Sequence, residues 1–193
     1  LDKHKTGNKN QFNRTAFSPP KVAMDQITEI RVETRPLTIK TIGEVSTETV
    51  SSVTETTGEV FKRMNYQGEP PEAISISQGA VVLPSGEKIE ACYSYNDKLK
   101  PGKILVSTEF SKKAFGESPL PTEMATAAFV AHEAVEHVNH MRGKDLLSSQ
   151  SKVPTEAHSK SKTEQEANKI AREVIGDLYG WIIYFADETP PSI

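Results

Sequence analysis

The chain has 193 residues, 36% of them hydrophobic, and a formal net charge of −3, so it is long enough for one sizeable hydrophobic core and too short for two full domains. This charge gives no electrostatic reason to expect a nucleic-acid or membrane partner, and no apolar stretch approaches the roughly 20 residues that are needed to span a bilayer. Its single cysteine, Cys92, excludes an internal disulfide and a cysteine-based metal cluster, so any metal must be held by histidine and carboxylate side chains.

The N-terminal part divides into a tail and the start of a fold. Residues 1–25 are basic, rich in Asn, Gly and Pro, and lack a hydrophobic period, which predicts a flexible lead-in. We therefore expect one domain over residues 26–193. Residues 27–42 are rich in β-branched side chains and are interrupted by Pro36, which indicates a broken or edge strand. Apolar residues recur at helical spacing over residues 44–64, which favours a helix despite the many threonines.

Three strands and two helices are expected in the rest of the chain. Turn residues separate the strand-like segments 73–83, 88–95 and 103–110, which predicts a small, mostly antiparallel sheet. Over residues 122–141 the apolar positions step by three and four, as in a helix. A polar stretch, residues 143–162, precedes a second helix that opens at Thr163 with the capping-box pattern Thr163-x-x-Glu166. The expected fold class is α+β, with the sheet packed on both helices.

Histidine and glutamate side chains are concentrated on the first of these helices. His132, His137 and His140 fall within nine residues, interleaved with Glu133 and Glu136. Zinc binds imidazole nitrogen and carboxylate oxygen in a tetrahedral arrangement, and a catalytic zinc site keeps one position open for water. This cluster therefore predicts a zinc site, although the same residues on a solvated helix would make only weak pairs of about 0.2–0.5 kcal/mol.

The spacing of the two histidines sets a geometric demand. His132 and His137 are five residues apart, which places them about 140° apart around an ideal helix, against about 40° for a spacing of four. Both side chains reach one ion only if a π-type bulge absorbs the extra residue. Glu136 and His140 are alternative ligands, because His132/Glu136, Glu133/His137 and Glu136/His140 are pairs with the four-residue spacing.

Two segments resemble known zinc enzymes. The hexapeptide His132-Glu133-Ala134-Val135-Glu136-His137 resembles the His-Glu-x-x-x-His zinc motif of the dipeptidyl peptidase III family. Glu164-Gln165-Glu166-Ala167-Asn168 resembles the Glu-x-x-Ala-Asn/Asp segment that supplies the third ligand in ImmA/IrrE-like metallopeptidases, and the short interval between the two segments suits that group. The resemblance covers about forty residues, roughly 129–171.

The resemblance implies a zincin-like (gluzincin) metallopeptidase that hydrolyses peptide bonds. Its implied Zn²⁺ ligands are His132, His137 and Glu164, and Glu133 is the implied general base that deprotonates the attacking water. Asn168, one turn beyond Glu164, is the implied support of the ligands. A further donor must stabilise the oxyanion, and its candidates are Tyr179, His158 and Tyr184.

The expected substrate is a peptide or protein. The strand at residues 104–110 is expected to be the sheet edge that binds it by strand addition, with the loop 143–162 bordering the cleft. Two other roles stay open: a catalytically silent zincin-like regulatory or interaction protein, and a bacterial effector or toxin domain. We expect a soluble protein, either cytoplasmic or delivered as a secreted effector, and make no prediction of its oligomeric state.

Overall fold

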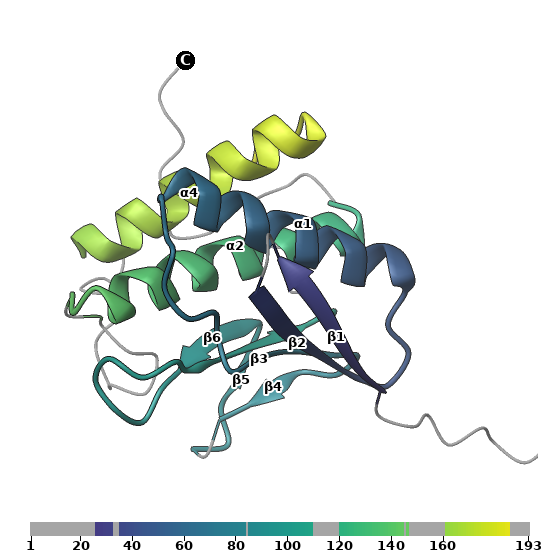
Figure 1. Ribbon diagram of the computed structural model, residues 1–193. Helices are drawn as coiled ribbons and strands as arrows, with labels where there is room; N and C mark the ends of the chain where they lie inside the picture. Colours follow the sequence, from purple (N-terminus) through teal and green to yellow (C-terminus); the bar gives the residue numbers. More distant parts are fainter. Residues whose placement is uncertain are drawn as a thin grey trace, which may run out of the picture.

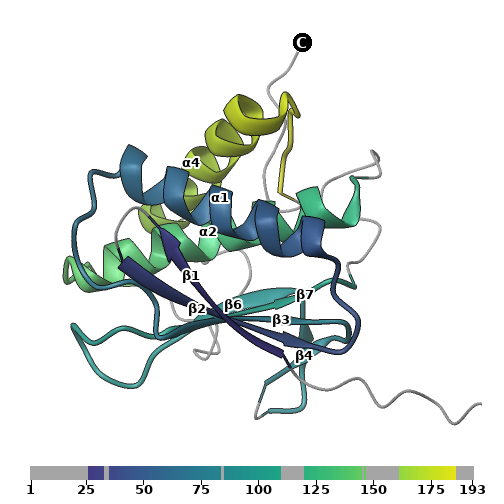
Figure 2. The ribbon, with the colours of Figure 1, turned by 45° about the vertical axis from the view of Figure 1, so that its right-hand side comes forward.

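Helices cover one face of a β-sheet. The computed structural model describes residues 26–32, 35–83, 85–109, 120–144, 146 and 161–185. Within these ranges, α1 and α2 lie on the sheet, and α4 lies over them on the side away from the strands (Figures 1 and 2). The elements are β1 (Gln26–Val32), β2 (Arg35–Ile42), α1 (Thr47–Arg63), β3 (Ala73–Ser77), β4 (Val81–Val82), β5 (Lys88–Ile89), β6 (Ala91–Ser94), β7 (Lys103–Ser107), α2 (Thr122–Met141) and α4 (Lys162–Tyr179).

The main sheet has the strand order β1-β2-β3-β7-β6. The pairs β1/β2 and β6/β7 are antiparallel, and β2/β3 and β3/β7 are parallel. The α+β class is confirmed, and the sheet is mixed. The expectation that residues 104–110 form an edge is wrong, because β7 lies between β3 and β6. The turn after Ser94 folds the chain back so that Tyr93 pairs with Ile104, which leaves β6 at the edge.

The threonine-rich segment at 44–64 forms the helix α1, as the apolar spacing predicts. Ser46 is its N-cap, and the Ser46 hydroxyl accepts a hydrogen bond from the Thr49 backbone N–H at 3.1 Å. The buried Thr57 hydroxyl donates to the Val53 carbonyl at 2.7 Å. Threonines can therefore be buried on this helix, because the helix backbone itself satisfies their hydroxyl groups.

The helix α2 is the centre of the fold and has the predicted bounds. It is α-helical throughout, so it contains no π-type bulge between His132 and His137. Small side chains such as Ala127, Ala131 and Ala134 are fully buried, and they let the sheet, α1 and α4 approach the helix closely. Polar side chains on α2 are consequently removed from water.

None of the described helices is long and apolar enough to cross a membrane.

The helix α4 begins and ends differently from the expectation. It starts after the N-cap Ser161, whose side chain makes no capping hydrogen bond. Glu166 does not complete a capping box, because its carboxylate accepts hydrogen bonds from Asn139 and Lys144. The helix stops at Gly180, which adopts the left-handed conformation with φ of 71°.

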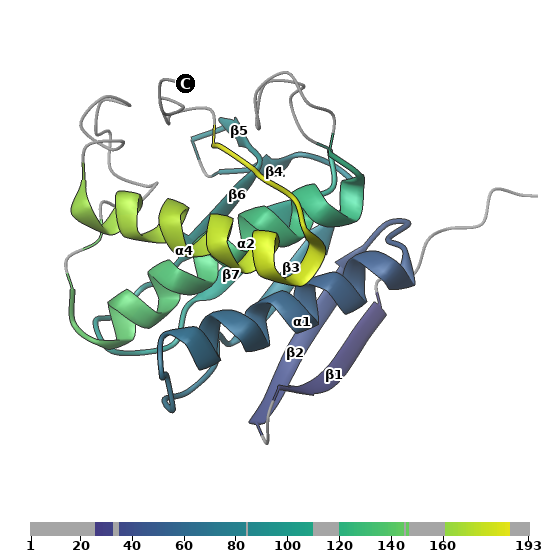
Figure 3. The same ribbon diagram turned by 90° about the horizontal axis from the view of Figure 1, so that it is seen from above.

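After Gly180 the chain turns back across the helices (Figure 3). Ile182 is therefore 79% exposed, whereas Ile183 and Phe185 are buried. The apolar spacing of residues 170–185 predicts that Ile182 and Phe185 share the apolar face of this helix, and the glycine turn is the reason why they lie elsewhere. Residues 1–25 and most of the loop 143–162 lie outside the described residues.

Candidate metal centre

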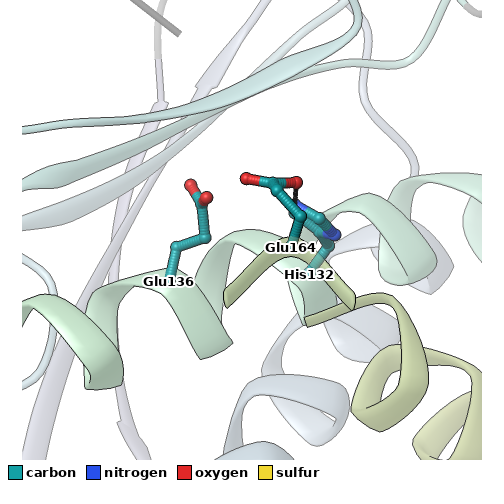
Figure 4. A group of neighbouring side chains, drawn as sticks. All are labelled: His132, Glu136 and Glu164. Atoms are coloured by element: carbon teal, nitrogen blue, oxygen red, sulfur yellow. Dashed lines mark ion pairs between the residues drawn. The ribbon is translucent and has the colours of Figure 1, made fainter. Parts of the chain in front are cut away.

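Three side chains from two helices converge on one point between α2 and α4. His132 and Glu136 come from α2, and Glu164 comes from the first turn of α4 (Figure 4). One ligand atom from each of these residues lies within 4.8 Å of the other two, so this group could hold a metal ion. His132 and Glu136 share a face of α2 because they are four residues apart.

The group concentrates negative charge away from water. Glu133, Glu136 and Glu164 are 6%, 8% and 1% exposed. The Glu136 carboxyl is in hydrogen-bond contact with both Glu133 and Glu164, and burial together with the negative charges of these two neighbours raises the pKa of Glu136 well above its usual range. A divalent cation at this position would relieve the repulsion among the three carboxylates.

The imidazole of His132 is oriented by neighbours on two sides. Its Nδ1 lies 2.8 Å from the Asn168 side-chain oxygen, and its Nε2 lies 3.3 Å from Oε2 of Glu164. Burial lowers the pKa of His132, but the hydrogen bond to Glu164 and the charges of Glu133 and Glu164 outweigh burial and raise that pKa to about 9. Because the Asn168 oxygen only accepts, Nδ1 carries a hydrogen and Nε2 is the atom presented to the group.

Aromatic rings shield the same imidazole from solvent. The ring centroid of Phe185 lies 5.5 Å from that of His132, and Phe129 packs edge-on against Phe185 at 6.1 Å. Sequence reasoning missed Phe185 as a site residue. Its only sequence signal is membership of an apolar run after α4, and that run does not indicate which residue it will contact.

His137, the expected second zinc ligand, lies elsewhere. It is fully buried; its Nε2 donates to the Glu69 carbonyl at 2.8 Å, and its Nδ1 lies 3.1 Å from the Tyr93 hydroxyl. Burial lowers the pKa of His137 to about 4. The structure therefore does not bring the set His132, His137 and Glu164 together. The physical reason is the regular α-helix, in which a five-residue spacing turns His137 away, and Glu136 occupies the place expected for His137.

Glu133, the expected general base, lies beside the group. Its carboxylate accepts a hydrogen bond from the backbone N–H of Tyr93 on the edge strand β6 and is in contact with Glu136. Burial is the main reason why the pKa of Glu133 is raised. The helix α2 thus holds this carboxylate between the group of His132, Glu136 and Glu164 and the open edge of the sheet.

The remaining candidates are not part of this group. His140 lies one turn beyond Glu136, and its Nδ1 lies 2.8 Å from the Tyr93 hydroxyl. The hydroxyl of Tyr179 donates to the Ser52 carbonyl of α1 at 3.3 Å. The ring of Tyr184 lies 5.4 Å from the guanidinium of Arg172, and His158 falls outside the described residues. Of the two candidates that the structure describes, Tyr179 and Tyr184 make their contacts with α1 and with Arg172, and the prediction for His158 lies outside the described residues.

Comparisons with known proteins do not assign the chain to a family. No protein-family model matches it, and neither curated proteins nor solved structures give a match. The conclusions therefore rest on the α+β fold and on the group formed by His132, Glu136 and Glu164.

Proposed function

We propose that the chain is a zinc-dependent metallopeptidase in which His132, Glu136 and Glu164 bind Zn²⁺ and Glu133 is the general base. The observation that carries this proposal is the convergence of an imidazole nitrogen and buried carboxylates on one point. Buried carboxylates are costly unless they are paired or coordinate a metal. Three protein ligands of these types, with a fourth position left for water, are typical of catalytic zinc sites.

The proposed ligand set has the spacing of the familiar peptidase helix. In that helix two ligands are four residues apart, and the residue after the first ligand is the general base. His132 and Glu136 have this spacing, and Glu133 follows His132. The zincin-like resemblance is therefore supported by a His-Glu-x-x-Glu arrangement in which a carboxylate takes the place of the second histidine, without any bulge.

Each residue has a defined part in the proposed hydrolysis. Bound zinc lowers the pKa of water to about 7 and polarises a carbonyl group. The Glu133 carboxylate accepts the proton of the attacking water and passes it to the amine that leaves. Asn168 keeps the His132 ring in place by accepting from its Nδ1–H.

The edge strand β6 is the proposed place for the substrate. Ser107 N–H of β7 donates to the carbonyl of Glu90, the residue that precedes β6. Since hydrogen-bonded pairs alternate along an antiparallel pair, the backbone groups of Ala91 and Tyr93 point away from β7. The hydrogen bond between Tyr93 N–H and Glu133 shows that this edge faces the proposed base. An extended peptide paired with β6 would bring a backbone carbonyl beside Glu133.

A non-catalytic role is the second proposal. His132 and Glu164 form an ion pair at 3.3 Å, and the Tyr93 N–H already donates a hydrogen bond to the Glu133 carboxylate. The same group could therefore serve as an internal polar network of a zincin-like regulatory or interaction protein. The effector or toxin role stays a prediction from the sequence.

Metal content and hydrolysis distinguish the two proposals. In the enzyme, Glu164→Gln should lose zinc, whereas Glu166→Gln, two residues along the same helix turn, should keep it. Glu133→Gln should retain zinc and lose hydrolysis of a casein or peptide-library substrate. Wild-type protein that binds zinc but cleaves nothing would favour the non-catalytic proposal, and protein that takes up no zinc would contradict the metallopeptidase proposal.

A further inference from the structure

The strand β1 forms the second edge of the main sheet, at the end opposite β6. It pairs with β2 on one side, and on the other side it is the outermost strand of the described chain (Figure 3). Its seven residues, Gln26–Val32, contain no proline, so each residue of the strand keeps its backbone N–H group. An edge of this kind is a template for pairing with another strand.

Two opposite charges are exposed on β1, two residues apart. Glu29 and Arg31 lie on the same face of the sheet, because side chains alternate along a strand. Across β2 they face Thr38 and Pro36, which are uncharged. Ile30, between the two charges in the sequence, is half-buried on the other face and packs against the core under the helices. The edge therefore carries a negative and a positive side chain in a fixed order.

We propose that β1 binds β1 of a second copy of this chain, antiparallel, with Ile30 opposite the partner's Ile30. In this register Glu29 lies opposite the partner's Arg31. The two-fold symmetry of such a dimer repeats the contact, so Arg31 lies opposite the partner's Glu29. Opposite charges directly across an antiparallel pair stabilise it. The strand is thus complementary in charge to its own copy.

Other registers between the two copies lack this match. A slide of two residues keeps the backbone pairing, but it places Glu29 opposite the partner's Glu29 in one direction and Arg31 opposite the partner's Arg31 in the other. Like charges directly across a strand pair are destabilising. A slide of one residue would put the helices of the two copies on opposite faces of the joined sheet. The charges therefore select a single register.

The same register covers apolar surface on the open face of the sheet. Ile27 is 68% exposed and lies diagonally across from the partner's Arg31, within reach of a long side chain. The aliphatic stem of arginine packs on apolar surface while its charged end stays in water. Because β6 lies at the far end of each sheet, the dimer leaves both copies of the proposed substrate edge open.

The contact is small, so the dimer is expected to be transient. The seven residues of β1 span about 23 Å of strand, and short interfaces of this kind belong to weak, reversible complexes. Sedimentation equilibrium of the full chain at concentrations up to about 1 mM covers this range of affinity. We expect the wild type to pass from monomer to dimer as its concentration rises.

Charge reversal tests the pairing. Arg31→Glu and Glu29→Arg each place like charges opposite one another in both contacts, so each should weaken the dimer by about ten-fold or more. An equimolar mixture of these two variants should dimerise within about three-fold of the wild type, because every contact between the two is again of opposite sign. The matched control is Lys40→Glu, which makes the same change of charge as Arg31→Glu on β2, one strand further in. It should leave the Kd within about three-fold of the wild type.

Disulfide formation tests the register. In the proposed dimer the two Cα atoms at Ile30 are about 4.5–5.5 Å apart, which suits a disulfide, so Ile30→Cys should cross-link on mild oxidation. Thr28→Cys, on the same face of β1, is the matched control. The two copies of Thr28 would be offset by about 13 Å along the strands, which is too far for a disulfide. The native Cys92 is buried in both variants.

Three results would overturn this inference: a monomer at every concentration, equal Kd values for Arg31→Glu and Lys40→Glu, or cross-linking of Thr28→Cys that equals or exceeds that of Ile30→Cys. None of these measurements depends on zinc or on hydrolysis. A dimer with the predicted charge and cross-link pattern that binds no zinc would support the β1 pairing and contradict the metallopeptidase proposal. A zinc peptidase that stays monomeric would do the reverse.

Discussion

Replacing Glu136 by glutamine should raise stability without metal and lower it with metal. Glu136 is 8% exposed, and burial together with the charges of Glu133 and Glu164 raises the pKa of its carboxyl group. An amide keeps the shape of the side chain and is neutral at every pH, so it removes the cost of keeping this buried carboxyl group either charged beside Glu133 and Glu164 or protonated. By comparison with other buried charged groups that are replaced by neutral ones, we expect a gain of about 1–2 kcal/mol. This gain corresponds to a melting temperature higher by roughly 2–8 °C for a chain of this length.

Zinc should reverse the order of the melting temperatures of the wild type and Glu136→Gln. At a zinc concentration of about 100 times the Kd, a bound metal stabilises the native state by about 2.7 kcal/mol. Wild-type protein should gain this stability, whereas Glu136→Gln lacks one ligand and should gain much less. The assay is thermal unfolding followed by circular dichroism, with EDTA and with zinc. Glu166→Gln is the control, because it alters the contacts with Asn139 and Lys144, neither of which belongs to the group of His132, Glu136 and Glu164.

Two results would refute this reasoning. The first is a melting temperature of Glu136→Gln below that of the wild type in EDTA, which would mean that Glu136 stabilises the metal-free fold. The second is an equal zinc-induced rise in both proteins, which would mean that Glu136 does not bind the metal. The second result would also contradict the choice of Glu136 over His137 as a ligand.

Three further predictions concern neighbours of the group. His137→Gln should lower the free energy of unfolding by about 1–3 kcal/mol, because it disturbs the hydrogen bonds to Glu69 and Tyr93. Its zinc affinity should stay within about three-fold of the wild type. Denaturant titration measures the stability, and metal competition measures the affinity. The pKa of His137 is about 4 when folded and about 6.5 when unfolded, so its contribution to stability is present above pH 6.5 and falls by roughly 3 kcal/mol as the pH falls to 4; denaturant titrations should show that His137→Gln removes this slope. Phe185→Ala should weaken zinc binding by about 10- to 100-fold, whereas Ile182→Ala, which truncates a 79% exposed side chain, should not; equal Kd values for these two variants in metal competition would contradict the prediction.

Local sequence patterns were sufficient for the helices and most strands. The apolar steps of three and four residues predict α2 with the bounds Thr122–Met141 that the structure has. The threonine-rich helix α1 is also predicted, because apolar spacing outweighs β-branching when threonine hydroxyls bond to the helix backbone. The strand order could not be predicted in the same way. Whether β7 or β6 forms the edge depends on pairing between segments far apart in the chain, and no local pattern encodes it.

The candidate site was partly predictable. The sequence indicates His132, Glu164 and the neighbouring Glu133, and the structure brings these residues close together. The sequence also contains the four-residue spacing of His132 and Glu136. Elementary helix geometry favours this spacing over the five-residue spacing of the resembled motif. Phe185 could not be predicted, because it reaches His132 only through the reversal at Gly180.

Anomalous diffraction at the zinc edge, from crystals of the full chain grown with zinc, is the most direct test of the metal centre. We expect one peak about 2.0–2.2 Å from Nε2 of His132 and from one carboxylate oxygen each of Glu136 and Glu164. A peak bound to His137, or no peak between α2 and α4 in zinc-saturated crystals, would contradict it.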